Sequence, residues 1–225
     1  MPAQALRGKR WDPAFWHAGR AELGEAPDVP CAPLGEFIEH ITYGPIVTGR
    51  RPEAVAKGVA IIDQGAIRPT GVLLERATVV AEGCDYDLAR CRLKPGDIVL
   101  ARSGAGTLAK KRFTVFRERM QATVSCFVDL IRLRGMSPYY VVTFLRSRLG
   151  WSQIDRLING VGTPNLSFGE IRSLRVPLLP HDEQQEIEAA WRGVERLHHK
   201  GRPKEAEAKL DEIVGWLEKR LAGRG

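Results

Sequence analysis

The chain has 225 residues, enough for one medium-sized domain with an appendage, and its hydrophobic fraction of 44% excludes a chain dominated by disorder. Its 34 basic side chains outnumber its 27 acidic ones, and the net charge of +7 favours a nucleic acid or another anionic surface as partner. No apolar signal segment or bilayer-spanning stretch is visible in the sequence, so we expect a cytoplasmic protein.

The cysteines show no pattern of a metal site or of a disulfide framework. Cys31, Cys84, Cys91 and Cys126 form no CxxC pair, and no histidine follows them at zinc-ligand spacing. We therefore expect reduced, structural cysteines, no bound metal and no cofactor.

Residues 1–33 form a basic and aromatic lead-in that ends in several prolines. Three large rings, Trp11, Phe15 and Trp16, lie close together in this arm. Free tails rarely carry so many rings, so we predict that the arm packs onto the domain; stacking of the rings on nucleic-acid bases is the alternative.

The next part of the chain is predicted to alternate short elements with basic loops. The expected elements are a short helix or strand at residues 34–41, a strand at residues 59–62 and a strand or short helix at residues 72–81. The arginine and lysine side chains of the intervening loops are candidates for contacts with an anionic partner.

Residues 93–112, LKPGDIVLARSGAGTLAKKR, place a cationic loop at the end of a short buried strand. Pro95-Gly96 predicts a turn, residues 98–101 predict the strand, and Lys110-Lys111-Arg112 closes the loop. Such a loop can bring backbone N–H groups and positive side chains against a polyanion.

The glycines of this loop also fit two nucleotide-binding patterns in part. Gly104 and Gly106 begin a G-x-G-x-x-A sequence, and Asp129 follows at the distance of a ribose-binding acid. That motif requires a helix directly after the glycines, whereas residues 112–116 are aromatic and β-branched and favour a strand. A P-loop is excluded because its second glycine is missing and Lys111 stands where Ser or Thr is required. We therefore interpret the segment as a basic loop.

The rest of the domain is predicted to be one strand followed mainly by helices. The expected elements are a strand at residues 122–133, a helix from Ser137-Pro138 to Gly160 interrupted at Gly150, a short helix capped by Ser167 and Glu170, and an extended segment at residues 176–180.

From residue 181 onward the composition is highly charged, with apolar residues three and four apart. Gly201-Arg202-Pro203 divides this tail into two amphipathic helices. Their apolar stripes need a partner, which is either the other helix in a hairpin or another chain. The candidates for a partner or dimer interface are Ile187, Trp191, Val194, Leu197, Leu210, Ile213 and Leu217.

Several of these segments resemble the specificity subunits of type I restriction-modification systems. The similar segments are residues 58–62, LKPGDIVLARSG at residues 93–104, LRSRLG at residues 145–150 and TPNLSFGEIRSLRVPLLPHDEQQEI at residues 163–187. The last of these is the most specific, because it combines L-S-x-x-x-I-x-x-L-x-V-P-L-x-P with E-Q-x-x-I at a helix start.

The resemblance implies an α/β (α+β) target recognition domain with a mixed, twisted sheet and flanking helices, followed by C-terminal amphipathic helices. We accordingly expect an arm at residues 1–33, a DNA target recognition domain at residues 34–180 and a helical tail at residues 181–225 for dimerisation or partner binding. Specificity subunits typically hold two recognition domains, so this chain resembles half of one.

The resemblance also implies a function. We expect a sequence-specific DNA recognition subunit, without catalysis of its own, in a restriction-modification complex or a related DNA methylation or defence complex. Its expected partners are double-stranded DNA, a DNA adenine methyltransferase subunit, in some complexes a restriction subunit, and a second copy of the chain. A homodimer joined through the tail would read the two halves of a palindromic site.

The family motifs mark the scaffold, so candidates for DNA contact rest on charge and position alone. Arginine can hold a guanine edge through two hydrogen bonds, whereas lysine more often contacts phosphate. The candidates are Arg50, Arg51, Lys57, Arg68, Arg102, Ser103, Lys110, Lys111, Arg112 and Arg117, and the cluster Lys110 to Arg112 is the strongest.

Two other classes of function are weighed against this one. An adenine methyltransferase needs an N-P-P-[YF] sequence, which Thr163-Pro164-Asn165-Leu166 does not supply, and the nuclease-like Glu207-Ala208-Lys209 lies in the charged tail. A protein-interaction adaptor with an incidental basic face is the alternative, and a salt-dependent DNA-binding assay separates it from a DNA reader.

Overall fold

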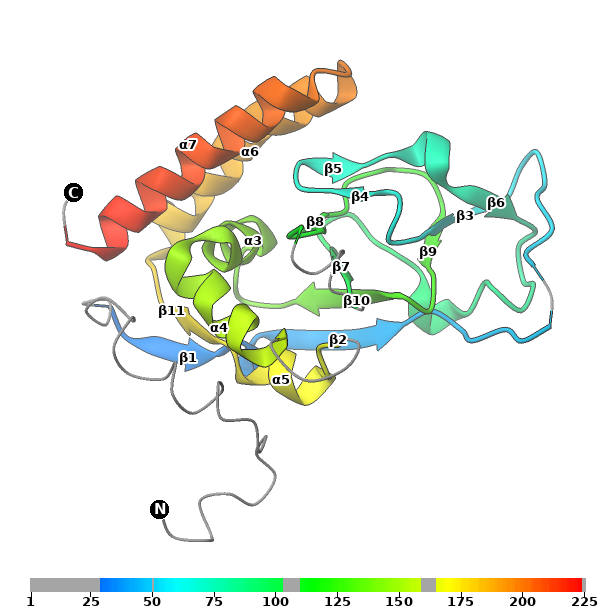
Figure 1. Cartoon of the computed structure of the whole chain (residues 1–225), viewed down its shortest axis with the longest axis horizontal. Coiled ribbons are helices and arrows are strands. Elements are labelled where there is room, and N and C mark those ends of the chain that lie inside the picture. Colours follow the sequence, from blue (N-terminus) through cyan, green and yellow to red (C-terminus); the bar gives the residue numbers. More distant parts are fainter. Residues whose placement is uncertain (1–28, 50, 103–109, 159–164, 224–225) are drawn as a thin grey trace, which may run out of the picture.

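The computed structural model describes residues 29–49, 51–102, 110–158 and 165–223. Most strands lie on one side of the molecule and most helices on the other, where a two-stranded sheet accompanies them, and two long C-terminal helices run along the outside of the helical side (Figure 1). The sheets and helices are combined as the sequence predicts for an α+β fold.

The central sheet has four antiparallel strands in the order β2-β10-β7-β8. Their bounds are Ile38–Tyr43 for β2, Val128–Leu133 for β10, Ile98–Ala101 for β7 and Phe113–Val115 for β8. The predicted strand at residues 98–101 is therefore confirmed, and residues 113–115 form a strand and not the helix that a dinucleotide motif requires.

Strand β7 is buried on both faces, and its side chains alternate between two separate cores. Ile98 and Leu100 belong to the larger core on the helical side, while Val99 and Ala101 belong to a second core on the opposite side. Successive residues of a strand point to opposite faces, so a strand covered on both faces is apolar throughout. This explains the uninterrupted apolar run that the sequence shows.

The second core lies between the central sheet and a mixed three-stranded sheet with the order β6-β3-β9. Strand β3 is antiparallel to β6 and parallel to β9, and the short hairpin β4–β5 adds Ile67 and Val72 to this core. The bounds are Val59–Ile62 for β3, Ile67–Arg68 for β4, Gly71–Val72 for β5, Thr78–Val80 for β6 and Ala122–Val124 for β9.

The predicted single strand at residues 122–133 is wrong, because the chain changes sheets in its middle. Strand β9 pairs with β3, strand β10 pairs with β2 and β7, and residues 125–127 form the turn between them. The Ser125 N–H donates to the carbonyl of Ile62 at 3.0 Å, and the Val128 N–H donates to the carbonyl of Ser125 at 3.0 Å. Both halves are apolar and β-branched, so sequence pattern alone does not reveal the break.

The predicted helix after Ser137 is present but breaks earlier than expected. Helix α3 spans Pro138–Arg146 and α4 spans Arg148–Ile158, so the break lies at Ser147 and not at Gly150. A Cβ atom at Gly150 would lie 2.0 Å from the carbonyl oxygen of Phe144. The glycine is therefore required for the close approach of the two helices, while the extended backbone of Ser147 makes the break itself.

The capped helix and the extended segment are confirmed and close the fold. Helix α5 spans Phe168–Ser173, and its capping box joins Ser167 and Glu170 in both directions. Strand β11, Arg175–Pro177, pairs antiparallel with β1, Cys31–Pro33. Three short 3₁₀ turns complete the described elements: η2 at Leu34–Glu36, η3 at Leu74–Arg76 and η4 at Ala89–Cys91.

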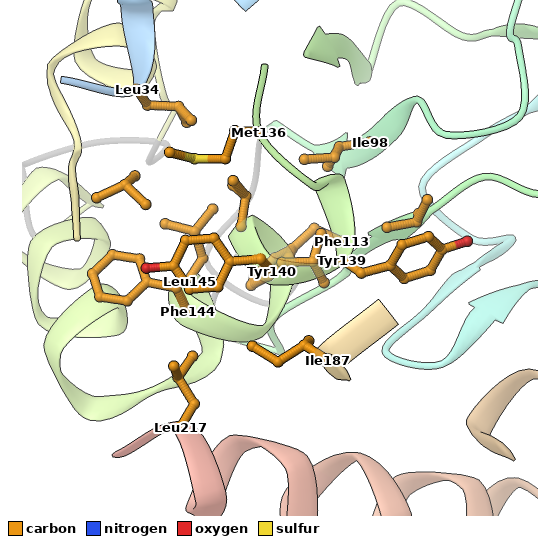
Figure 2. Packing of buried hydrophobic residues seen from close by; sticks show 14 of the residues in the cluster. Leu34, Ile98, Phe113, Met136, Tyr139, Tyr140, Phe144, Leu145, Ile187 and Leu217 are labelled. Carbon is orange, nitrogen blue, oxygen red and sulfur yellow. The ribbon is translucent and has the colours of Figure 1, made fainter. Parts of the chain in front are cut away.

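The two predicted C-terminal helices form a hairpin that packs on α3. They are α6, His181–His199, and α7, Pro203–Leu221. In Figure 2 the α3 residues Tyr140 and Leu145 lie between Ile98 of the sheet and Leu217 of α7. The indole Nε1–H of Trp191 on α6 donates to Thr143 Oγ1 on α3 at 2.9 Å, so the hairpin shares the larger core with the sheet.

Of the two partners expected for the apolar stripes, the structure shows the hairpin, and it corrects the assignment of these residues to an interface with a second chain. The candidates are buried in the same chain because the helices fold back on each other and on α3. The buried candidates are Ile187, Trp191, Val194, Leu210, Ile213 and Leu217, and Leu197 is partly buried against them.

The described residues add three further observations. None of their helices is long and apolar enough to cross a membrane. They contain no group of three or more potential metal-binding side chains, and all four cysteines are free thiols.

We expect Trp191→Ala to lower the free energy of unfolding by about 3–5 kcal/mol, because it opens a cavity between α3 and α6 and removes the hydrogen bond that Thr143 Oγ1 accepts from the indole. Urea unfolding followed by circular dichroism measures this loss. Met120 is 38% exposed and lies outside the helices, so Met120→Ala is the control and should change stability by less than about 1 kcal/mol. Equal effects of the two substitutions would contradict the shared core.

Candidate nucleic-acid interface

Four chain segments meet at one end of the central sheet. Strands β2 and β7 both run antiparallel to β10, so β2 and β7 end at the same edge, where β8 and β10 begin. We call this edge the loop end of the sheet; its described segments are residues 43–49, 110–112, 125–127 and 165–168.

Backbone hydrogen bonds hold these segments together. The Gly44 N–H donates to the carbonyl of Ser125 at 3.2 Å, and the Arg102 N–H donates to the carbonyl of Phe127 at 3.1 Å. The Leu166 N–H in turn donates to the carbonyl of Arg102 at 3.4 Å. The loop end is therefore a set of connected turns on a rigid sheet, which suits precise presentation of side chains.

Arg102, the residue directly after β7, lies beside two aromatic rings. Its guanidinium carbon lies 4.3 Å from the ring centroid of Tyr43 and 5.7 Å from that of Phe168. Its Nε lies 3.3 Å from Oδ1 of Asp129, and only 17% of its side chain is exposed. Stacking of a cation on two rings restricts the plane of the guanidinium.

Asp129 is a buried carboxylate with an incomplete partner. It lies on β10, fully buried, and neither of its oxygens accepts a hydrogen bond from the described residues. Burial raises the pKa of Asp129 to about 7, and the positive charge of Arg102 opposes this rise. Its position inside the sheet also excludes the ribose-binding role that its spacing suggested.

The cationic cluster at residues 110–112 is not three free charges, which corrects the expectation for this loop. Lys110 is exposed and has no partner among the described residues. Lys111 adopts a positive φ of 48°, donates from Nζ to the carbonyl of Arg146 at 3.0 Å and lies 4.8 Å from the ring centroid of Trp151. Burial and the neighbouring Arg146 lower the pKa of Lys111. Arg112 donates from Nη1 to the carbonyl of Gln64 at 3.2 Å.

Two more candidates are held by the protein itself. Arg68 donates from Nη1 to the carbonyls of Gly65 and Ile67, both at 2.9 Å. Arg117 lies 3.1 Å from Oε2 of Glu195 and 5.5 Å from the ring centroid of Tyr139, so it joins the far end of β8 to the helices. Both side chains therefore serve local structure.

The remaining candidates divide into two groups. Arg51 and Lys57 are exposed on the loop between β2 and β3, without a partner in the part of the chain that the structure describes. Arg50 and Ser103 lie outside the described residues.

The structure also shows exposed apolar side chains that sequence reasoning missed. Ile46 is 70% exposed and Phe127 is 53% exposed, and both lie on loop-end segments. Phe127 was assigned to the interior of a strand, and only the polar pair Ser125-Cys126 before it signals the turn. Tyr43 and Phe168, which lie beside Arg102, were likewise not predicted as partners because they are distant in sequence.

Comparison with known proteins gives a match in fold only. No protein-family model and no curated protein sequence matches the chain. A solved HsdS subunit from Thermoanaerobacter tengcongensis has a TM-score of 0.53 at 13% identity, and the match covers 94% of this chain and 50% of the subunit. A structure of the type I R-M system, described for its complex assembly and conformational transition, has a TM-score of 0.53 at 14% identity, covering 92% of this chain and 48% of the other.

A third solved structure, the type IIG restriction endonuclease BpuSI, has a TM-score of 0.52 at 9% identity and covers 82% of this chain but 31% of the enzyme. The chain thus has the fold of type I restriction-modification specificity subunits, as its sequence predicted, and spans about half the length of those that it matches. The predicted α+β class with C-terminal helices is confirmed at the same level.

Asp129 predicts how stability depends on pH. Its pKa in the folded chain, about 7, is above the ordinary value of 3.8, so its stabilising contribution is complete below pH 4 and is lost as the pH rises through 7. We expect this group alone to lower the free energy of unfolding by roughly 2 kcal/mol between pH 5 and pH 8. Asp129→Asn should reduce that fall, as measured by urea unfolding at both pH values.

Asp155→Asn, an exposed substitution on α4, is the matched control and should keep the pH dependence of the unchanged chain. If Asp129→Asn keeps it as well, Asp129 does not titrate in this range.

Proposed function

We propose that the chain is a sequence-specific DNA recognition subunit of a restriction-modification complex, or of a related DNA methylation or defence complex, and that it positions a separate methyltransferase subunit on the target. The supporting observation is the loop end, where a positioned arginine, exposed apolar side chains and the free cation Lys110 lie together on the fold of specificity subunits. Positive charge for phosphate and planar donors for base edges are what DNA recognition requires.

We further propose that two parts of the chain, although they share one core, bind different partners. Residues 34–180 contact DNA, and residues 181–225 bind partner chains through the outer face of the hairpin. The catalytic step is assigned to the methyltransferase, because the sequence supplies no adenine-methyltransferase motif.

A groove between α6 and α7 provides the partner surface in this proposal. Its volume is about 320 Å³, and its walls include Ala190, Lys209, Glu212 and the exposed ring of Trp216. We assign it to a second copy of the chain, because one chain spans about half of the specificity subunits whose fold it shares. A two-fold axis would then bring two loop ends to one palindromic DNA site.

The same groove favours the alternative function. A protein-interaction adaptor also needs an exposed aromatic side chain beside an apolar groove, and its basic face would be incidental. The two functions differ in DNA binding, which only the recognition subunit needs.

We expect Lys110→Ala to make the dependence of log affinity on log salt shallower by about 0.9, the loss of one phosphate contact. The expectation rests on Lys110 being the exposed, unpartnered cation of its cluster. Fluorescence anisotropy with double-stranded DNA at several salt concentrations gives the slope. Lys204→Ala, an exposed lysine at the start of α7, is the control and should leave the slope unchanged. Equal slopes for both variants and the unchanged chain would favour the adaptor.

We expect the chain to be a dimer at micromolar concentration and Trp216→Glu to shift it toward the monomer, because the substitution removes a large apolar ring from the interface and puts there a carboxylate that is costly to desolvate. Light scattering after size exclusion measures the mass. Met120→Glu, at a residue of similar exposure (38% against 41%), is the matched control and should leave the dimer intact. A monomeric unchanged chain would rule out the homodimer and leave the groove to a methyltransferase subunit. Truncation after Pro180 is unsuitable for this test, because it removes α6 and α7 from the core.

A further inference from the structure

We propose that Arg102 reads a guanine base in the DNA target, and that Tyr43, Phe168 and Asp129 hold its guanidinium in the reading position. This inference rests on the proposed DNA-recognition function and names the residue that contributes one base of the specificity.

Two aromatic rings lie beside the Arg102 guanidinium, both toward the same side of the group. Tyr43 comes from the end of β2 and Phe168 from the start of α5, and their ring centroids are 5.9 Å apart at an interplanar angle of 46°. The guanidinium carbon is within 4.3 Å and 5.7 Å of these centroids. Cation–π contacts of this kind use no N–H bond, so the donors of the group stay available for hydrogen bonding.

The Nε side of the Arg102 guanidinium faces a buried carboxylate. Nε of Arg102 is buried, 3.3 Å from Oδ1 of the fully buried Asp129. The buried atoms without a hydrogen-bond partner include Nε but neither terminal nitrogen, and no described residue accepts a hydrogen bond from Nη1 or Nη2. We infer that the exposed 17% of the side chain is the end that carries these two nitrogens.

The backbone of Arg102 is held as firmly as its side chain. Its N–H donates to Phe127 and its carbonyl accepts from Leu166, which ties β7 to the β9–β10 turn and to the start of α5. Binding through a group that is already ordered avoids the entropy cost of fixing a long side chain. A surface cation that serves only as a charge for phosphate does not need this support, as the unpartnered Lys110 shows.

The chemistry of such an arginine favours guanine. Two in-plane N–H groups match the O6 and N7 acceptors of guanine in the major groove, whereas adenine presents a donor where guanine presents O6. The exposed side chains of Ile46 and Phe127, on neighbouring loop-end segments, can cover the apolar parts of the adjoining nucleotides.

The test selects binding sites for the full chain from a random pool of double-stranded DNA, followed by sequencing. We expect the unchanged chain to select a motif that contains a guanine dependent on Arg102. Arg102→Lys keeps the positive charge but loses the planar pair of donors, so preference at that one position should fall by about 10- to 100-fold. The other positions and the salt slope should stay as they are. Arg192→Lys, the same exchange at an exposed arginine of α6, is the matched control and should leave the motif unchanged.

A second measurement uses the unchanged chain and so does not depend on the folding of a variant. Replacing the assigned guanine by 7-deazaguanine removes N7 and should weaken binding, and Arg102→Lys should be insensitive to this replacement. A motif that Arg102→Lys leaves intact, an equal loss at every position, or a motif with no guanine sensitive to 7-deazaguanine would each overturn the role of Arg102 while leaving DNA recognition in place. The absence of any selected motif would overturn both.

Discussion

The burial of β7 on both faces is the constraint on which the rest of the structure depends. Ile98 and Leu100 anchor the helical core, and Val99 and Ala101 anchor the core under the mixed sheet. A strand held from both sides has little freedom, since its side chains interdigitate with two close-packed interiors. Arg102, the next residue along the chain, leaves the sheet at a point that both cores determine together.

Burying charged groups at the loop end costs desolvation energy, and the contacts of these groups offset that cost only in part. Asp129 lies fully buried beside Arg102 without hydrogen bonds from the described residues, and its pKa rises to about 7 because burial outweighs the attraction of the neighbouring cation. Lys111 and Arg112, in contrast, bind backbone carbonyls and hold their loop to α3 and to the β3–β4 connection. Net charge therefore overstates how many cations are available to a partner, and position decides which ones are.

The helical hairpin belongs to the same core as the sheet. Trp191 and Leu217 pack on α3, so the side of α6 and α7 that remains for another chain is the outer groove beside Trp216. A partner that bound there would contact helices directly coupled to α3. The N–H of Ser137, the residue before α3, also donates to Oε1 of Gln184 on α6 at 2.9 Å. The physical connection between a partner surface and the loop end is thus continuous packing.

The sequence by itself determined the elements whose signal is local: the apolar run of β7 and β3, the capping box at Ser167 and the two C-terminal helices. Its resemblance to specificity subunits also predicted the fold that the comparisons show. Only the tertiary structure decided which of the predicted cations are free, because Lys111, Arg117 and their partners are distant in sequence. The tertiary structure also decided where residues 122–133 divide into two strands, and it decided that the apolar faces of α6 and α7 pack on each other and on α3. A helical apolar periodicity indicates that one face of the helix is buried, but it does not indicate which part of this chain, or which other chain, covers that face.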